Sequence, residues 1–242
     1  MGRMILIEGL DLAGKSTLVE GLRAHFESQE QKVRVANGQF CQPNPAAEVA
    51  RQLVRWDSGF GGMEAGSLFL STMLWDERHF LSPSEGVHLQ DSSWLRTLAF
   101  EQLYGSPVLA DLMEQVGARL PRFDAAVMLT ASLPERQRRL QLRAHNDLHD
   151  QLAARNPQKF LAIEQRLAEL VQGWERGRVL ATDGLTPQQV LSECLQVLGE
   201  PEPGPVEGLA TDASGPRGCR TRPPANSRAR AADAARAAAL PG

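Results

Sequence analysis

The feature that most constrains this sequence is a glycine-rich motif near its first residue. Residues 9–17 read Gly-Leu-Asp-Leu-Ala-Gly-Lys-Ser-Thr, which satisfies the pattern G-x-x-x-x-G-K-[ST]. The apolar run Ile5-Leu6-Ile7 precedes the motif, and a segment with apolar residues at helical spacing follows it. The motif therefore lies between a predicted strand and a predicted helix, which is the context of a phosphate-binding loop, or P-loop.

The residue types of the loop explain its expected chemistry. The two glycines permit a tight turn, and backbone N–H groups surround a phosphate at the start of the helix. We expect Lys15 to reach the β- and γ-phosphate oxygens and the Ser16 hydroxyl to ligate Mg²⁺. The predicted nucleotide-binding residues are Gly9, Leu10, Asp11, Leu12, Ala13, Gly14, Lys15, Ser16 and Thr17. The alternatives are a glycine turn that matches the pattern by chance and a nucleotide-binding switch without catalysis.

Short β-rich runs alternate with amphipathic segments along the first 199 residues. The runs lie at residues 4–8, 33–36, 87–90, 125–130 and 179–181. Helical spacing covers residues 16–28, 46–56, 66–80, 94–120, 133–144 and 157–173, and Thr186-Pro187 begins one more helix. This alternation predicts an α/β fold: a P-loop NTPase three-layer sandwich with a five-stranded parallel sheet.

Composition divides the chain and excludes several classes of partner. Residues 200–242 are rich in Pro, Gly, Ala and Arg in low-complexity order, so we expect a folded domain over 1–199 and a disordered tail over 200–242. The net charge of −3 offers no bulk polycation for nucleic acid, and no run of eighteen apolar residues predicts a membrane partner. The three scattered cysteines give neither a disulfide framework nor a CxxC pair, which favours a cytoplasmic location.

Four segments together resemble the thymidylate kinase family of P-loop nucleotide kinases. They are residues 5–17, residues 89–100 with the sequence Leu-Gln-Asp-Ser-Ser-Trp-Leu-Arg-Thr-Leu-Ala-Phe, residues 133–150, and residues 180–190. The resemblance implies ATP and Mg²⁺ as cofactors, phosphoryl transfer to a small-molecule acceptor as the reaction, and a helical lid at about 136–156. A homodimer is among the possible oligomeric states.

Two acidic residues are candidates for the reaction site. Asp11, inside the loop, contacts the acceptor sugar in the family that the chain resembles, and its alternative role is that of a loop-capping residue. Asp91 ends a predicted parallel strand, where a carboxylate can hold Mg²⁺-bound water or orient the attacking hydroxyl. Its alternative role is that of a helix N-cap before Trp94.

A further cation is expected in the transition state, because phosphoryl transfer spreads negative charge over the transferred oxygens. Leu12 stands where some members of the family carry an arginine, so the lid is expected to supply it. Helical spacing places Arg136, Arg139 and Arg143 on one face and Arg138 elsewhere. All four arginines are candidates, and we predict that Arg139 and Arg143 act in catalysis; the alternative is a solvated basic face.

The acceptor side departs from the family pattern. The segment 35–40 lacks the family's arginine, and Ser92 follows Asp91 where the family has another. Between residues 40 and 134 there are six arginines and no lysine against eleven acidic residues. These features favour a nucleoside, sugar or amino sugar over a nucleoside monophosphate as acceptor. The alternative is a dTMP kinase in which Arg78 or Arg96 binds the acceptor phosphate.

Overall fold

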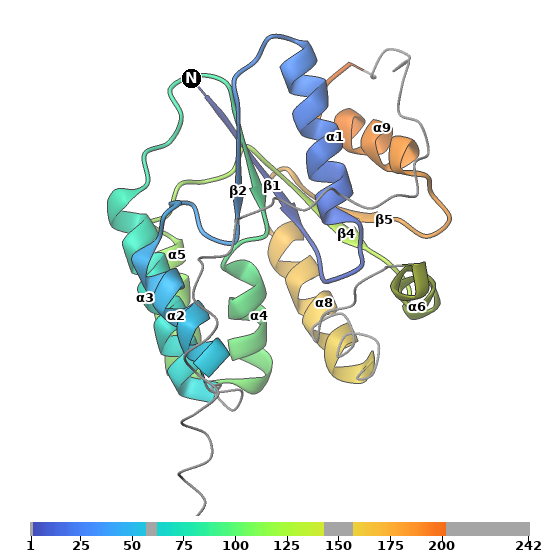
Figure 1. The fold of residues 1–242 in the computed structure, drawn as a ribbon. Helices are drawn as coiled ribbons and strands as arrows, with labels where there is room; N and C mark the ends of the chain where they lie inside the picture. The colour runs from blue at the N-terminus through green and yellow to red at the C-terminus, as the bar shows by residue number, and fades with distance from the viewer. Residues whose placement is uncertain (1, 57–61, 143–156, 202–242) are drawn as a thin grey trace, which may run out of the picture. The chain divides into compact units, whose positions relative to one another are not determined.

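The computed structural model describes residues 2–56, 62–142 and 157–201. At its centre is a five-stranded sheet in the order β2-β3-β1-β4-β5, with every neighbouring pair parallel (Figure 1). The strands are β1 (Arg3–Glu8), β2 (Val33–Asn37), β3 (Val87–Asp91), β4 (Ala125–Thr130) and β5 (Gly177–Ala181). All five coincide with the predicted runs to within two residues at either end. The predicted α/β fold with a five-stranded parallel sheet is therefore confirmed.

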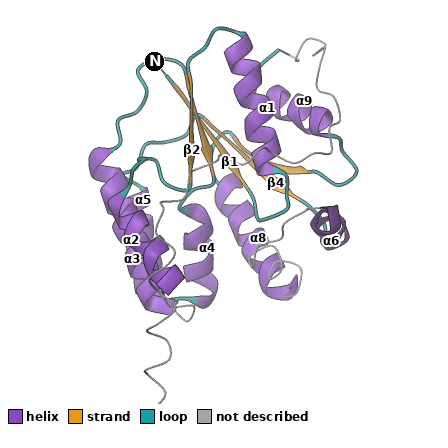
Figure 2. Cartoon of the chain, viewed as in Figure 1, coloured by secondary structure: helices purple, strands orange, loops and turns teal. Residues whose placement is uncertain are grey.

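Helices cover both faces of the sheet (Figure 2). One face carries α1 (Lys15–Ser28) and α9 (Pro187–Leu198), which pack against each other. The other face carries α4 (Leu95–Tyr104) and α8 (Pro157–Gln172), and outside them lie α2 (Pro45–Trp56), α3 (Gly62–His79) and α5 (Pro107–Gly117). The short helix α6 (Leu133–Leu142) follows β4.

Strand alternation explains the two cores. On β1, Ile5 and Ile7 face the α1 and α9 side, whereas Leu6 faces α4 and α8. All three are fully buried, as expected for a central parallel strand with helices on both faces. The core packing therefore fixes the carboxyl ends of β1 and of its neighbours β3 and β4. The loops that follow these strands begin from well-packed positions.

The structure corrects one predicted helix. Residues 94–120 form two helices, α4 and α5, instead of one, because Pro107 has no N–H group and cannot continue a helix from α4. The Ser106 side chain caps α5 by accepting from the Leu109 N–H, and the Ser106 N–H donates to the Glu101 carboxylate at 2.9 Å. The Gly105-Ser106-Pro107 sequence is typical of a helix end followed by a new helix start, so the break was visible in the sequence.

Several expectations concern residues outside the described ranges. These are most of the lid at 143–156, including Arg143, the tail beyond residue 201, and Cys219. The domain boundary at residue 199 therefore stays a prediction. Cys41 and Cys194 are buried free thiols. None of the helices in the described part of the chain has both the length and the apolar character needed to cross a membrane.

A buried histidine in β3 should make the fold sensitive to acid. His88 is fully buried, and its Nε2 lies 3.0 Å from the Gln90 side-chain oxygen. Its Nδ1 has no hydrogen-bond partner among the described residues. Burial lowers the pKa of His88 below its ordinary 6.5, and the nearby Arg34 charge acts in the same direction.

We expect the free energy of unfolding to fall as the pH drops below about 6.5, because the unfolded chain then binds a proton that folded His88 does not accept. The contribution approaches about 1.4 kcal/mol per pH unit. Urea unfolding between about pH 7.5 and about pH 5.5 measures it. His88→Leu should lose this dependence, whereas the exposed-site variant His79→Gln should keep it. Equal pH dependence in His88→Leu and wild type would contradict the prediction.

Candidate functional site

The P-loop leaves the carboxyl end of the central strand β1 and turns into α1. Gly9 has φ 136°, and a Cβ atom there would lie 2.4 Å from the Leu129 carbonyl oxygen, so no other residue fits this close approach to β4. Gly14 is the N-cap of α1 with φ 100° and provides no side-chain cap. The first N–H groups of α1 therefore point out of the helix start without a capping side chain, as an anion site requires.

Glu8 fixes the start of this loop, a role that the sequence analysis missed. One carboxylate oxygen accepts from the Gly9 N–H at 3.0 Å, and the other accepts from the Ser93 N–H at 2.9 Å and the Ser93 hydroxyl at 3.0 Å. Burial raises the pKa of Glu8, and the Lys15 charge opposes this rise. Glu8 thereby ties the P-loop to the segment that follows β3. A charged residue at the end of an apolar strand was its only signal in the sequence.

Lys15 lies among carboxylates. Its Nζ donates to the Leu10 carbonyl oxygen at 3.1 Å, so the side chain folds back over the loop. Burial lowers the pKa of Lys15, whereas Glu8, Asp11 and Asp91 raise it. The lysine is thus already placed at the centre of the loop.

Asp11 is paired with an arginine from α4. The Arg96 guanidinium donates to both carboxylate oxygens of Asp11, at 3.2 and 2.7 Å, in a bidentate arrangement. Burial lowers the pKa of Arg96, but the carboxylates of Asp11, Glu8 and Asp91 outweigh it and the net shift is upward. The sequence analysis named Arg96 only as one alternative for binding the acceptor phosphate, because nothing local links residues 11 and 96.

Asp91 lies at the end of β3, beside the P-loop. Its carboxylate accepts weakly from the Asn37 amide and from the Ser92 hydroxyl, both at 3.4 Å, and the residue is 6% exposed. Burial raises the pKa of Asp91, opposed chiefly by Lys15. The alternative role as an N-cap of α4 is not observed, because the N-cap is Trp94 and the Leu95 N–H donates to Ser93.

Arg139 reaches the P-loop from the opposite side. It donates to the Leu12 carbonyl oxygen at 2.8 Å, to the Thr182 hydroxyl at 3.0 Å, to the Thr182 carbonyl oxygen at 2.9 Å and to Glu135 at 2.8 Å. These bonds use four of its five N–H donors. In this structure Arg139 joins α6 to the loop and to the end of β5, and its expected action on the transferred phosphoryl group stays a prediction.

The other lid arginines have different environments. Arg136 is 1% exposed, forms an ion pair with Glu164 and lies over the Phe160 ring at 4.5 Å, so it is a core residue and not a candidate for catalysis. Arg138 is exposed and pairs with Glu135, as the alternative of a solvated basic face predicts. Arg143 lies outside the described residues.

The site offers oxygen donors suited to Mg²⁺. The Ser16 hydroxyl lies in the exposed first turn of α1, and the Asp91 carboxylate retains acceptor capacity beyond its two long contacts. Among the described residues, no group of three or more His, Cys, Asp or Glu side chains is arranged to hold a metal by itself. This donor set suits a Mg²⁺ ion that takes its other ligands from nucleotide phosphates and water.

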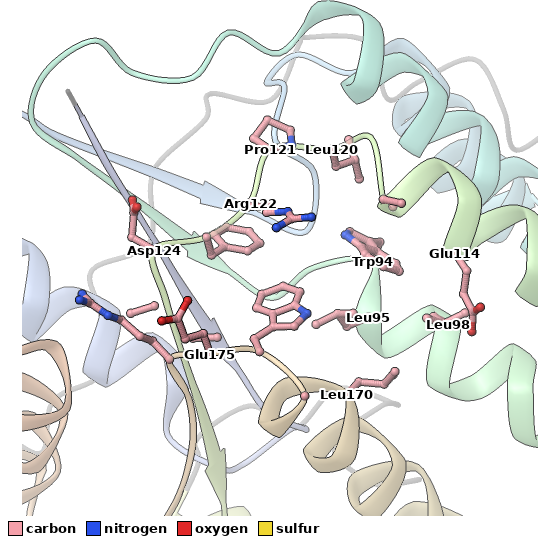
Figure 3. Close-up of a pocket in the computed structure, with 18 residues that line it drawn as sticks. Trp94, Leu95, Leu98, Glu114, Leu120, Pro121, Arg122, Asp124, Leu170 and Glu175 are labelled. Carbon is pink, nitrogen blue, oxygen red and sulfur yellow. The ribbon is translucent and has the colours of Figure 1, made fainter.

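A cavity of about 820 Å³ lies away from this site (Figure 3). It opens under the amino end of β4, between α4, α5 and the end of α8, and Trp94, Arg122 and Glu175 are among its lining residues. Because β1 and β4 are parallel, the cavity lies at the amino ends of the strands, whereas the P-loop lies at their carboxyl ends. None of the P-loop residues lines the cavity, so we do not include it in the candidate site.

These features define a P-loop α/β protein, and comparison with solved structures gives its particular fold. A thymidylate kinase from Candida albicans superimposes with a TM-score of 0.60 at 19% identity, over 82% of this chain and 91% of the other. A thymidylate kinase from Ehrlichia chaffeensis gives a TM-score of 0.55 at 16% identity, over 81% of this chain and 98% of the other. No family model and no curated protein matches the sequence. The chain thus has the fold of thymidylate kinases.

Proposed function

We propose that this protein is an ATP- and Mg²⁺-dependent kinase that phosphorylates a nucleoside monophosphate, in the manner of dTMP kinases. The observation that carries the proposal is a complete P-loop, with Lys15 among Glu8, Asp11 and Asp91, on a fold that matches thymidylate kinases over four fifths of the chain. A fold alone does not define a reaction, but the loop supplies the site in which the reaction takes place.

The structural neighbours favour a phosphorylated acceptor over the uncharged acceptor that the sequence analysis preferred. Both are named as kinases of thymidylate, which is itself a nucleoside monophosphate. Arg96, which the sequence offered as one alternative for binding the acceptor phosphate, also lies at the P-loop, since it reaches Asp11 from α4. The structure of the Candida enzyme is described as revealing the origin of a broad substrate specificity, so several nucleotides should be tested.

Acidic residues between positions 40 and 134 include some with structural roles, so their number does not define the charge of the acceptor site. Asp76 is buried and accepts from the Phe40 N–H, the Cys41 N–H and the Asn44 amide, which holds the loop after β2. Glu101 is buried and accepts from the Ser106 N–H at the start of α5. Such carboxylates have structural hydrogen-bond partners, so a count of acids over residues 40–134 does not describe the lining of the acceptor site.

The proposed reaction assigns each part of the site a task. The P-loop N–H groups and Lys15 bind the donor phosphates, and Ser16 and Asp91 would hold Mg²⁺, which would offset negative charge on those phosphates. An oxygen of the acceptor phosphate attacks the γ-phosphorus, and the bond from that phosphorus to the bridging β–γ oxygen breaks. The products are ADP and a nucleoside diphosphate, and Lys15 offsets the charge that develops on the transferred group.

Coupled ADP release tests the proposal at fixed Mg²⁺ and ATP. We expect kcat/KM for dTMP to exceed that for thymidine, sugars and aminoglycosides. A higher value for an unphosphorylated acceptor would restore the reading in which a nucleoside, sugar or amino sugar is the substrate. ATP binding without acceptor-dependent ADP release would identify a regulatory nucleotide-binding protein instead.

Asp91→Asn tests the proposed metal role, because it keeps the shape of the side chain and removes its charge. We expect kcat to fall by about tenfold or more while the KM for ATP changes little, since the loop still binds the donor phosphates. The matched control is Asp111→Asn, an exposed position on α5, which should behave as wild type. Steady-state kinetics with dTMP measure both parameters. An unchanged kcat in Asp91→Asn would contradict the proposed role of Asp91 in holding Mg²⁺.

A further inference from the structure

We propose that Arg96 binds the phosphate of the acceptor, and that Asp11 serves to position Arg96. This inference rests on the proposed function and names the residue that replaces the two family arginines absent from segment 35–40 and from position 92. It also decides between the two arginines, Arg78 and Arg96, that the sequence left open.

The location of Arg96 relative to Lys15 is the first step. An acceptor phosphate oxygen must come next to the γ-phosphoryl group that Lys15 contacts, so the cation that binds the acceptor must lie near Lys15. The Arg96 charge is close enough to lower the pKa of Lys15, and Arg96 also interacts with Glu8 and Asp91. Arg78 does not meet this requirement, because it is an exposed residue in the last turn of α3.

The direction of approach is the second step. Arg96 is the second residue of α4, which follows β3, and β3 lies between β1 and β2. Asn37, at the end of β2, contacts Asp91 on this same side of the P-loop. Arg139 and Thr182 contact the loop from the β4 and β5 side. The two cations therefore flank the loop from opposite sides, with Arg96 on the side of Asp91.

The donor inventory of Arg96 is the third step. A guanidinium has five N–H donors, and the two bonds to Asp11 use one on each terminal nitrogen. Among the described residues the other three donors have no hydrogen-bond partner, and 37% of the Arg96 side chain is exposed, so a ligand can reach it. The Asp11 carboxylate holds the plane of the guanidinium, which reduces the conformational entropy lost when a phosphate binds.

This geometry gives Asp11 a role different from the one implied by the family resemblance. Both oxygens of its carboxylate face Arg96, so we assign it as a positioning residue that acts through the guanidinium. Its removal should then have a larger effect on dTMP binding while Arg96 is present than in its absence, which a double-mutant cycle detects.

The experiment measures dTMP kinetics and dTMP binding in Arg96→Met, Arg96→Lys, Asp11→Asn and the double variant Asp11→Asn/Arg96→Met. Arg96→Met should raise the KM and the calorimetric Kd for dTMP by about tenfold to a hundredfold and leave the KM for ATP unchanged. Arg96→Lys should recover part of the loss, because lysine restores the charge without the fork. Arg78→Met is the matched control and should bind dTMP as wild type does.

The outcomes separate the inference from the function. Wild-type turnover of dTMP with an unchanged Kd in Arg96→Met would overturn the inference and leave the proposed kinase activity intact. Absence of both dTMP turnover and dTMP binding in the wild type would overturn the proposed function itself. An Asp11→Asn effect of equal size with and without Arg96 would overturn the positioning role of Asp11, and a larger effect in the presence of Arg96 would support it.

Discussion

Lys15→Ala should lower the turnover of ATP and acceptor by at least about a hundredfold, the largest effect on activity that the site predicts. The Nζ of Lys15 lies over the loop, bound to the Leu10 carbonyl oxygen, in the position to exchange this bond for a phosphate oxygen. Its charge is held among Glu8, Asp11 and Asp91, and alanine leaves these carboxylates to face the donor phosphates without it. Coupled ADP release with saturating acceptor measures the loss.

Stability provides the control for this experiment. Burial lowers the pKa of Lys15, so the folded protein already bears a cost for keeping the lysine charged, and alanine should leave the folded state close to its normal stability. Lys32→Ala removes an exposed lysine that pairs with Glu85 and should leave turnover unchanged. Near-normal turnover of a folded Lys15→Ala protein would rule out the kinase proposal.

The sheet and the P-loop were predictable from sequence because their signals are local. Apolar runs such as Ile5-Leu6-Ile7 mark strands that are buried on both faces, and the glycine spacing marks the turn into α1. The helix break before Pro107 was equally local, but apolar spacing on both sides concealed it. Local patterns thus located the elements, and the sheet order then determined which of their ends meet.

The partners within the site were not predictable in the same way. Glu8 and Ser93, and likewise Asp11 and Arg96, are 85 residues apart, and only the pairing of β1 with β3 brings them together. Counting charges over residues 40–134 treated all acids as equivalent, whereas the fold places Asp76 in a hydrogen-bonded core position and Asp91 at the loop. Net charge describes long-range attraction, and the identity of a bound anion depends on individual donors.

Arg136 shows the same limit in the lid. Its helical spacing placed it with Arg139 as a candidate for catalysis, yet it faces the protein core and not the P-loop. Burial lowers the pKa of Arg136 and raises that of Glu164, and the attraction between the two side chains opposes both shifts. The Phe160 ring below the guanidinium adds a cation–π contact at 4.5 Å.

Arg136→Met should therefore destabilise the fold by about 3 to 5 kcal/mol, because it leaves Glu164 buried without its partner. Urea unfolding followed by circular dichroism measures the change. The double variant Arg136→Met/Glu164→Leu should recover most of the loss, since an apolar pair of similar size avoids burying any charge. Arg138→Met, two residues along the same helix but exposed, should unfold close to wild type. Equal unfolding curves for Arg136→Met and wild type would mean that Arg136 is free of the core in solution, and would return it to the set of arginines available to the P-loop.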